Sequence, residues 1–183
     1  AHDDKVQAVL NLLRKKEKDP ESVMVIEILE KILSYIPGQS LEVLREWMIE
    51  QYAWLFEFEK RLGDYYTIRY EDFIDGEYGG LEKYLGFSLA GEAKVDNENR
   101  HVIRTKGYGD WKNWFTPQDI KFFRPIFRDY MEYYGYGDNW ELNHKRIINP
   151  EFSSRYVLRT VELRRKRSGL FNKLNNLMSR IWN

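Results

Sequence analysis

The residues best suited to chemistry lie in one segment, "RTKGYGDWKNWFT", at residues 104–116. Arg104 and Lys106 supply positive charge, and the glycines let backbone N–H groups come close to a ligand. A guanidinium can hold a phosphate through two parallel hydrogen bonds. The helix expected to begin after Thr116 would add the positive end of its dipole. These features favour an anion site, and a solvated turn rimmed by charge is the structural alternative.

Composition limits the kinds of protein that this chain can be. Its 183 residues include 29 basic and 29 acidic side chains, so the formal net charge is zero and bulk attraction to nucleic acid is not indicated. The absence of cysteine excludes disulfides and thiolate metal sites. The three histidines are far apart in sequence, so no metal site is expected. Neither a signal-peptide pattern nor an apolar run of about 18 residues is present, which predicts a cytoplasmic protein.

The N-terminal third of the chain, up to residue 63, has the hydrophobic spacing of helices. One helix is expected within residues 4–18. A second is expected to begin at Asp19 as N-cap, with Pro20 at its first helical position. A third is expected to start after a Pro-Gly break and to end at Gly63. Its many aromatic rings are expected to pack in the core.

The sequence pattern changes at residues 64–73, "DYYTIRYEDF". These β-branched and aromatic residues predict the only convincing strand of the chain. A single strand cannot form a stable sheet, so its neighbours are expected from another chain or from sequence beyond these residues. A short helix is expected at residues 81–87, and a polar loop at residues 88–100.

A further helix is expected directly after the glycine-containing segment. Thr116 is the expected N-cap, with Pro117 at the first helical position and Asp119 as the partner in a capping box. The helix is expected to bend at Pro125 and to end at Gly135 or at Gly137.

Residues 151–183 differ from the rest of the chain in charge. From residue 155 onward, eight basic side chains accompany the single acidic Glu162. Residues 170–182 place seven apolar side chains on one helical stripe. Such a stripe packs in a core or on a partner helix, or it lies on an anionic membrane surface. We therefore divide the chain into residues 1–150 and a basic, amphipathic helical tail at 151–183.

Two segments, in their order along the chain, resemble the sulfotransferases that use 3′-phosphoadenosine 5′-phosphosulfate (PAPS). In that family an Arg stands five residues before the Gly of "GDWKN", and "FT" follows and opens a helix. Arg104 and Gly109 have this spacing, and "GDWKNWFT" ends at Thr116. Upstream, "IRYEDF" at residues 68–73, followed by "LGF" at 85–87, is similar to the family's "RYED…FLG" segment.

The resemblance implies a nucleotide site. Arg104 would contact the 3′-phosphate of PAPS or of adenosine 3′,5′-bisphosphate, and backbone groups of Thr105, Lys106 and Gly107 would complete the phosphate loop. Trp111 would either stack on the base or orient the loop. The family has Arg-Lys-Gly or Arg-Thr-Gly-Lys at this point, whereas this chain has Arg-Thr-Lys-Gly, so its glycine comes one place later.

The "RYED" segment and a nearby histidine receive structural roles. Tyr70, Glu71 and Asp72 are expected to hold the strand to the loop rather than to touch substrate. His101 lies three residues before Arg104 and is a candidate base. A loop histidine at the cofactor end is the better interpretation, because a base has to reach the proton of the acceptor. No catalytic residue is therefore assigned.

The resemblance also implies parts that this chain does not carry. The family's phosphosulfate loop, with its Lys-Ser/Thr-Gly-Thr turn, has no counterpart in the 183 residues, and the usual catalytic histidine precedes the matched region. The expected fold is therefore mostly α with one or few strands, as the C-terminal part of a P-loop-like α/β sulfotransferase fold. The catalytic half would come from a missing N-terminal half or from a second chain.

The leading functional hypothesis is transfer of a sulfuryl group from PAPS to the hydroxyl or amine of a small-molecule or glycan acceptor. The helices before residue 63 would shape the acceptor pocket. The alternative is a non-catalytic helical binding or scaffold module whose basic tail, residues 155–183, contacts a partner or the membrane periphery. Nucleic-acid binding through residues 155–167 is disfavoured by the zero net charge.

Overall fold

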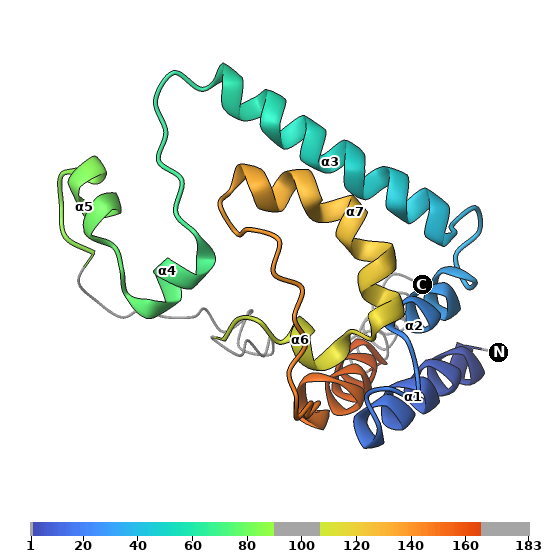
Figure 1. Cartoon of the computed structure of the whole chain (residues 1–183). Coiled ribbons are helices and arrows are strands. Elements are labelled where there is room, and N and C mark those ends of the chain that lie inside the picture. Colours follow the sequence, from blue (N-terminus) through green and yellow to red (C-terminus); the bar gives the residue numbers. More distant parts are fainter. Residues whose placement is uncertain (1, 90–106, 166–183) are drawn as a thin grey trace, which may run out of the picture.

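The computed structural model describes residues 2–89 and 107–165, and over these ranges the chain is mostly helical and contains no β-strand (Figure 1). The α-helical expectation is therefore confirmed. None of the described helices is long and apolar enough to cross a bilayer. The helices are α1 (His2–Lys18), α2 (Val25–Leu33), α3 (Leu41–Arg61), α4 (Tyr70–Asp75), α5 (Gly79–Leu85), α6 (Trp111–Trp114) and α7 (Pro117–Tyr133), followed by a 3-10 turn (Pro150–Phe152) and a helical run at 154–165.

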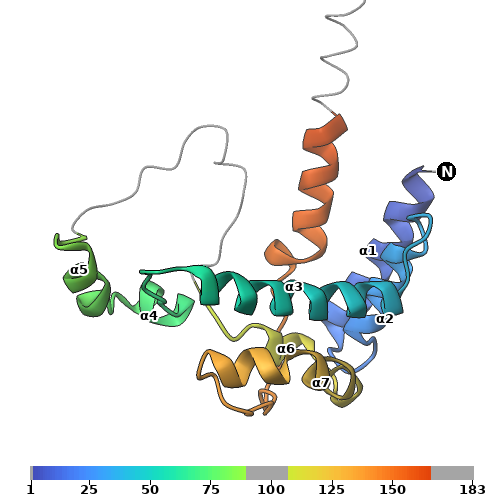
Figure 2. The ribbon, with the colours of Figure 1, turned by 90° about the horizontal axis from the view of Figure 1, so that it is seen from above.

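The helices are arranged as a chain of neighbours. α1 packs against α2, α2 packs against α3, and α3 packs against α7. Both views place α4 and α5 at the opposite end of the molecule from α1 and α2 (Figures 1 and 2). The molecule therefore has a packed helical body and an α4–α5 arm.

The core lies at the α1–α2 end of the body. Leu10 is 1% exposed on α1, as the helical spacing of its apolar residues predicts. Leu13 forms a buried cluster with Val23 and Ile28, and Val157 of the helical run at 154–165 packs against this cluster. The backbone N–H of Ser154 also donates to a carboxylate oxygen of α1. The last described helix is thus tied to the first.

The start of α2 differs from the prediction. The helix begins at Val25, five residues after Pro20, and Met24 is its N-cap. Asp19 instead folds a turn, because its carboxylate accepts a hydrogen bond from the backbone N–H of Glu21 at 3.0 Å. Lys16 stabilises this turn by donating hydrogen bonds to the backbone carbonyls of Pro20 and Val23. The prediction of Asp19 as N-cap is therefore wrong, since Asp19 lies in a turn that a side chain of the previous helix stabilises.

The predicted strand at residues 64–73 is wrong. Residues 65–69 have no regular secondary structure, and Tyr70–Asp75 form α4. The described part of the chain offers no second strand, so a ladder of hydrogen bonds has no partner to form with. Arg69 instead precedes the helix and makes two hydrogen bonds with Asp72, at 2.9 and 2.7 Å, which span its first turn.

Aromatic rings from both helices pack at the interface between α3 and α7. The Tyr52 ring lies 5.4 Å from that of Phe127 and 4.7 Å from that of Tyr130, measured between centroids. The Tyr134 hydroxyl donates to the buried carboxylate of Glu59 at 2.9 Å. The prediction that the aromatic rings of α3 pack in the core is wrong for three of them, which are exposed on its outer side: Trp47, Trp54 and Phe58.

The start, bend and end of α7 follow the local sequence. Thr116 is the N-cap, Pro117 occupies the first turn, and Pro125 lies inside the helix. Figure 1 shows that α7 changes direction along its length, as expected for an internal proline. Gly135 follows the C-cap in the left-handed region, at φ 72°, which confirms the predicted end. On the two sides of Pro125, α7 contributes Phe123 and Ile126 to the buried interior.

Candidate functional site

The structure describes part of the predicted nucleotide site. Arg104, Thr105 and Lys106 lie outside the described residues, whereas Gly107 and Trp111 lie within them. The 3′-phosphate contact of Arg104 therefore stays a prediction. The structure does show the surface around Gly107 and Trp111, the described part of the predicted site.

The "GDWKN" residues form a tight turn that opens the short helix α6. Gly109 has φ 77°, a conformation that favours glycine. Its carbonyl accepts a hydrogen bond from the N–H of Lys112 at 3.0 Å. Asn143 holds the other side of α6, because its side-chain amide donates to Asn113 at 2.7 Å. The turn is therefore fixed both locally and by the segment that follows α7.

The two segments that carry the family resemblance lie side by side. The Tyr108 hydroxyl, next to Gly107, donates to the Asp75 carboxylate of α4 at 2.7 Å. Glu71, also on α4, accepts a hydrogen bond from the Tyr136 hydroxyl at 3.0 Å. The role of Glu71 in holding the loop at 104–116 stays a prediction, because its hydrogen-bond partner Tyr136 lies beyond α7.

The residues on either side of Glu71 in the sequence, Tyr70 and Asp72, do not share this hydrogen bond. Asp72 pairs with Arg69 on its own helix instead of reaching the loop. Tyr70 is 51% exposed. Two carboxylates one helical turn apart therefore attach α4 to the rest of the molecule, Asp75 to Tyr108 and Glu71 to Tyr136.

Residues from both segments line a hollow of about 520 Å³, which we call the loop pocket. Among the described residues of its wall, Lys112 is the one cation, and Glu71 and Asp110 are carboxylates. These charges alone do not attract a phosphate. An anion at this position therefore requires positive charge beyond that of the described wall.

A second hollow of about 300 Å³, which we call the aromatic pocket, adjoins the loop pocket. Trp111 and Glu71 belong to the walls of both. Apart from Glu71, the wall is almost entirely apolar. It is lined by Glu71, Trp111, Phe115, Phe127, Tyr130, Met131, Tyr136 and Trp140. The sequence analysis singled out Trp111 but missed the other rings. Phe127, Tyr130 and Met131 share one face of a predicted helix, whereas nothing local marks Tyr136 and Trp140 as its neighbours.

Burial controls the acidity of the tyrosines in and near the aromatic pocket. It raises the pKa of Tyr136 to about 12, and the hydrogen bond to Glu71 adds to this effect. Burial also raises the pKa of Tyr130, with the charges of Glu71 and Glu59 acting in the same direction. Both phenols stay protonated at neutral pH, so they act as hydrogen-bond donors and not as bases.

An alkaline titration is expected to show delayed ionisation of these phenols. The pKa of Tyr52, like that of Tyr136, is raised to about 12 from an ordinary value of 10.0. Because the folded pKa is the higher one, their contribution to stability is complete below pH 10 and is lost as the pH rises towards 12. Phenolate absorbance should develop in two steps for the folded chain and in one step in urea. The variant Tyr136→Phe should reduce the amplitude of the late step. A single step both for the folded chain and in urea would contradict the raised pKa values.

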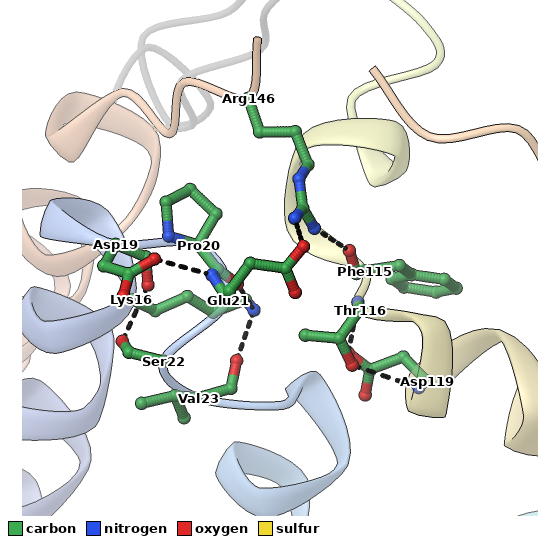
Figure 3. Close-up of polar contacts among 10 residues, drawn as sticks. All are labelled: Lys16, Asp19, Pro20, Glu21, Ser22, Val23, Phe115, Thr116, Asp119 and Arg146. Atoms are coloured by element: carbon green, nitrogen blue, oxygen red, sulfur yellow. Dashed lines mark hydrogen bonds and ion pairs between the residues drawn. The ribbon is translucent and has the colours of Figure 1, made fainter. Parts of the chain in front are cut away.

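The N-terminus of α7 is already occupied by a carboxylate (Figure 3). Asp119 is fully buried and accepts hydrogen bonds from the backbone N–H and the hydroxyl of Thr116, at 2.8 and 2.9 Å. Its other oxygen accepts from the backbone N–H of Ile26, in the first turn of α2, at 3.0 Å. The expectation that this helix end adds to an anion site is therefore wrong, because the chain's own carboxylate takes that position.

Comparison with protein-family models, with curated proteins and with solved structures finds no match for this chain. Within residues 2–89 and 107–165, no cluster of three or more histidine, aspartate or glutamate side chains could hold a metal ion. The loop pocket, the aromatic pocket and the sequence of the segments that form them are therefore the features that bear on function.

Proposed function

We propose that this chain binds PAPS, and its product adenosine 3′,5′-bisphosphate, as the nucleotide 3′-phosphate-binding part of a sulfotransferase. The observation that carries the proposal is the meeting of the two family-like segments at the loop pocket. Glu71 comes from the "RYED" segment, and Gly109 and Asp110 come from the "GDWKN" segment. Glu71 and Tyr108, more than 30 positions apart, thus line one hollow, and Tyr108 follows Arg104 by four positions in the sequence.

The charges of the loop pocket make the proposal specific. Glu71 and Asp110 line the hollow, so a phosphate there is repelled unless cations offset them. Arg104 and Lys106 come directly before Gly107 in the sequence and supply the required charge. The affinity for a 3′-phosphate should therefore depend steeply on Arg104, while Lys112 contributes from the wall.

The chemistry proposed for the complete enzyme is sulfuryl transfer. The acceptor oxygen or nitrogen forms a bond to sulfur as the bond from sulfur to the phosphate oxygen breaks. The acceptor proton passes to a general base, and adenosine 3′,5′-bisphosphate leaves. Cations and backbone donors stabilise the charge that develops on the leaving phosphate, as in phosphoryl transfer. The base, the phosphosulfate loop and the sheet of the α/β fold would come from a preceding segment or a second chain.

Calorimetric titration with adenosine 3′,5′-bisphosphate tests the proposal. We expect saturable binding that Arg104→Ala weakens by about 2 kcal/mol, roughly 30-fold, because a charged hydrogen-bond partner of the phosphate is lost. Arg128→Ala is the matched control, since the Arg128 side chain is 68% exposed and lies outside both pockets.

A second ligand separates 3′-phosphate recognition from general nucleotide binding. Adenosine 5′-monophosphate lacks the 3′-phosphate, so its affinity should be lower and should not change in Arg104→Ala. Equal affinity for the two nucleotides would contradict the assignment of Arg104. Absence of saturable binding of the bisphosphate would leave the non-catalytic helical module as the better hypothesis.

A further inference from the structure

We propose that the aromatic pocket binds a small organic cation, such as a quaternary or methylated ammonium group, with Glu71 as its counter-ion. This site lies beside the proposed nucleotide site and does not depend on it. The proposal rests on the rings of the wall, on their fixed positions and on the charge of the one acidic side chain among them.

The rings of the wall are held in place by contacts with one another and with α3. On the α6 side, the Trp111 ring lies 5.6 Å from that of Phe115 and 5.4 Å from that of Trp140, between centroids. On the α7 side, Phe127 and Tyr130 both pack against Tyr52 of α3. A ligand therefore meets rings that need little ordering, which lowers the cost of binding.

The charge of the pocket selects the class of ligand. Among the residues of its wall, Glu71 is the only acidic side chain, and none is basic. An anion would be repelled by this carboxylate. A bare divalent metal ion would need several oxygen ligands, whereas the wall offers one carboxylate and two phenols. A cation covered by methyl groups suits both features, because the methyl groups contact ring faces and the charge interacts with Glu71.

The geometry around Glu71 and Trp111 supports this choice. The Tyr136 hydroxyl donates to one oxygen of Glu71 at 3.0 Å and so fixes the carboxylate at the wall. The ammonium of Lys112 lies 5.7 Å from the centroid of the Trp111 ring. Lys112 lines the loop pocket and not the aromatic pocket. The Trp111 ring, which belongs to the walls of both pockets, thus already lies within reach of a cation of the chain itself.

The volume of the pocket indicates a compact ligand. At about 300 Å³ it lies at the lower limit of pockets that hold small molecules. A trimethylammonium head group with a short substituent is of suitable size. We therefore choose choline as the probe, and 3,3-dimethylbutan-1-ol, its neutral isostere, as the matched control ligand.

Protein-observed NMR of the whole chain tests the proposal through the indole N–H signals of Trp111 and Trp140. Choline should shift these signals in a saturable manner. The affinity of the neutral alcohol should be lower than that of choline by a factor of about ten or more. Glu71→Gln should weaken choline about tenfold and should leave the affinity for the alcohol unchanged. This variant keeps an oxygen that can accept from Tyr136, so the fold is preserved.

The control variant is Glu77→Gln, which removes an exposed carboxylate just beyond the end of α4 and should leave choline binding unchanged. Equal affinity for choline and the alcohol would overturn the proposal, since it would show an apolar pocket without preference for a cation. It would also be overturned if choline produced no saturable shift, or if Glu71→Gln and Glu77→Gln bound choline equally. Binding of adenosine 3′,5′-bisphosphate is measured separately, so either proposal can fail alone.

Discussion

Asp119→Ala is expected to destabilise the fold by about 3–5 kcal/mol. The fully buried Asp119 carboxylate accepts hydrogen bonds from the backbone N–H groups of Thr116 and Ile26, at 2.8 and 3.0 Å. One carboxylate thereby accepts hydrogen bonds from backbone N–H groups at the N-termini of both α7 and α2. Alanine would leave donors of both helices unsatisfied in the interior, and it would remove the negative charge close to the buried Lys16.

Urea unfolding measures this loss, with Asp129→Ala as the matched control. Asp129 lies on the same helix, and its side chain is 75% exposed, so its removal should change the free energy of unfolding by less than about 0.5 kcal/mol. Asp119→Asn should give an intermediate loss, because one oxygen remains but the charge and the second acceptor are gone. Equal stability of Asp119→Ala and Asp129→Ala would show that α2 and α7 do not depend on this carboxylate.

Lys16→Met is expected to cost about 2–4 kcal/mol, because it leaves two backbone carbonyls without their donor. Lys16 is fully buried, and its ammonium donates to the carbonyl of Pro20 at 2.9 Å and to that of Val23 (Figure 3). These two bonds close the turn between α1 and α2. Methionine has a similar length and fills the same space, so the loss isolates the polar contribution.

The pH dependence of Lys16→Met follows from the acidity of this lysine. Burial lowers the pKa of Lys16 below 10.5, and the nearby Asp119 charge opposes that change. The unfolded chain therefore binds the proton more tightly than the folded chain, and the Lys16 contribution to stability rises with pH between the lowered pKa and 10.5. Urea unfolding at several pH values should show a larger difference between wild type and variant as the pH rises in this range. A difference that shrinks would contradict the direction of the shift.

Elements defined by neighbouring residues were predictable from the sequence, and elements defined by distant ones were not. The start of α7 was predicted correctly because Thr116, Pro117 and Asp119 cap the helix locally. The start of α2 was not, because Lys16 of the preceding helix determines the turn. A strand was predicted at residues 64–73 from composition alone, but β-structure needs a second strand, and the described residues contain none.

The same distinction holds for the candidate sites. The "GDWKN" turn was predictable, since Gly109 adopts φ 77° within its own short segment. The second hydrogen-bonding role of Asp119, toward Ile26, joins residues 93 positions apart and has no local signal. The aromatic pocket is equally non-local, because Glu71 of α4, Trp111 of α6 and Tyr130 of α7 meet there. The role of Arg104 remains a prediction from the sequence.

The α4–α5 arm has a consequence for hydrogen exchange. Neither α4 nor α5 contains a fully buried residue, and both lie at the end of the molecule away from the core. Hydrogen bonds from Tyr108 to Asp75 and from Tyr136 to Glu71 attach α4 to the body. Amides of residues 70–85 should therefore exchange through local opening, at a free energy below that of global unfolding. Glu71 lines both pockets, so a ligand in either pocket should stabilise the attached arm and slow amide exchange throughout it. Ligand binding at the two pockets would then be coupled through the same local opening of the arm.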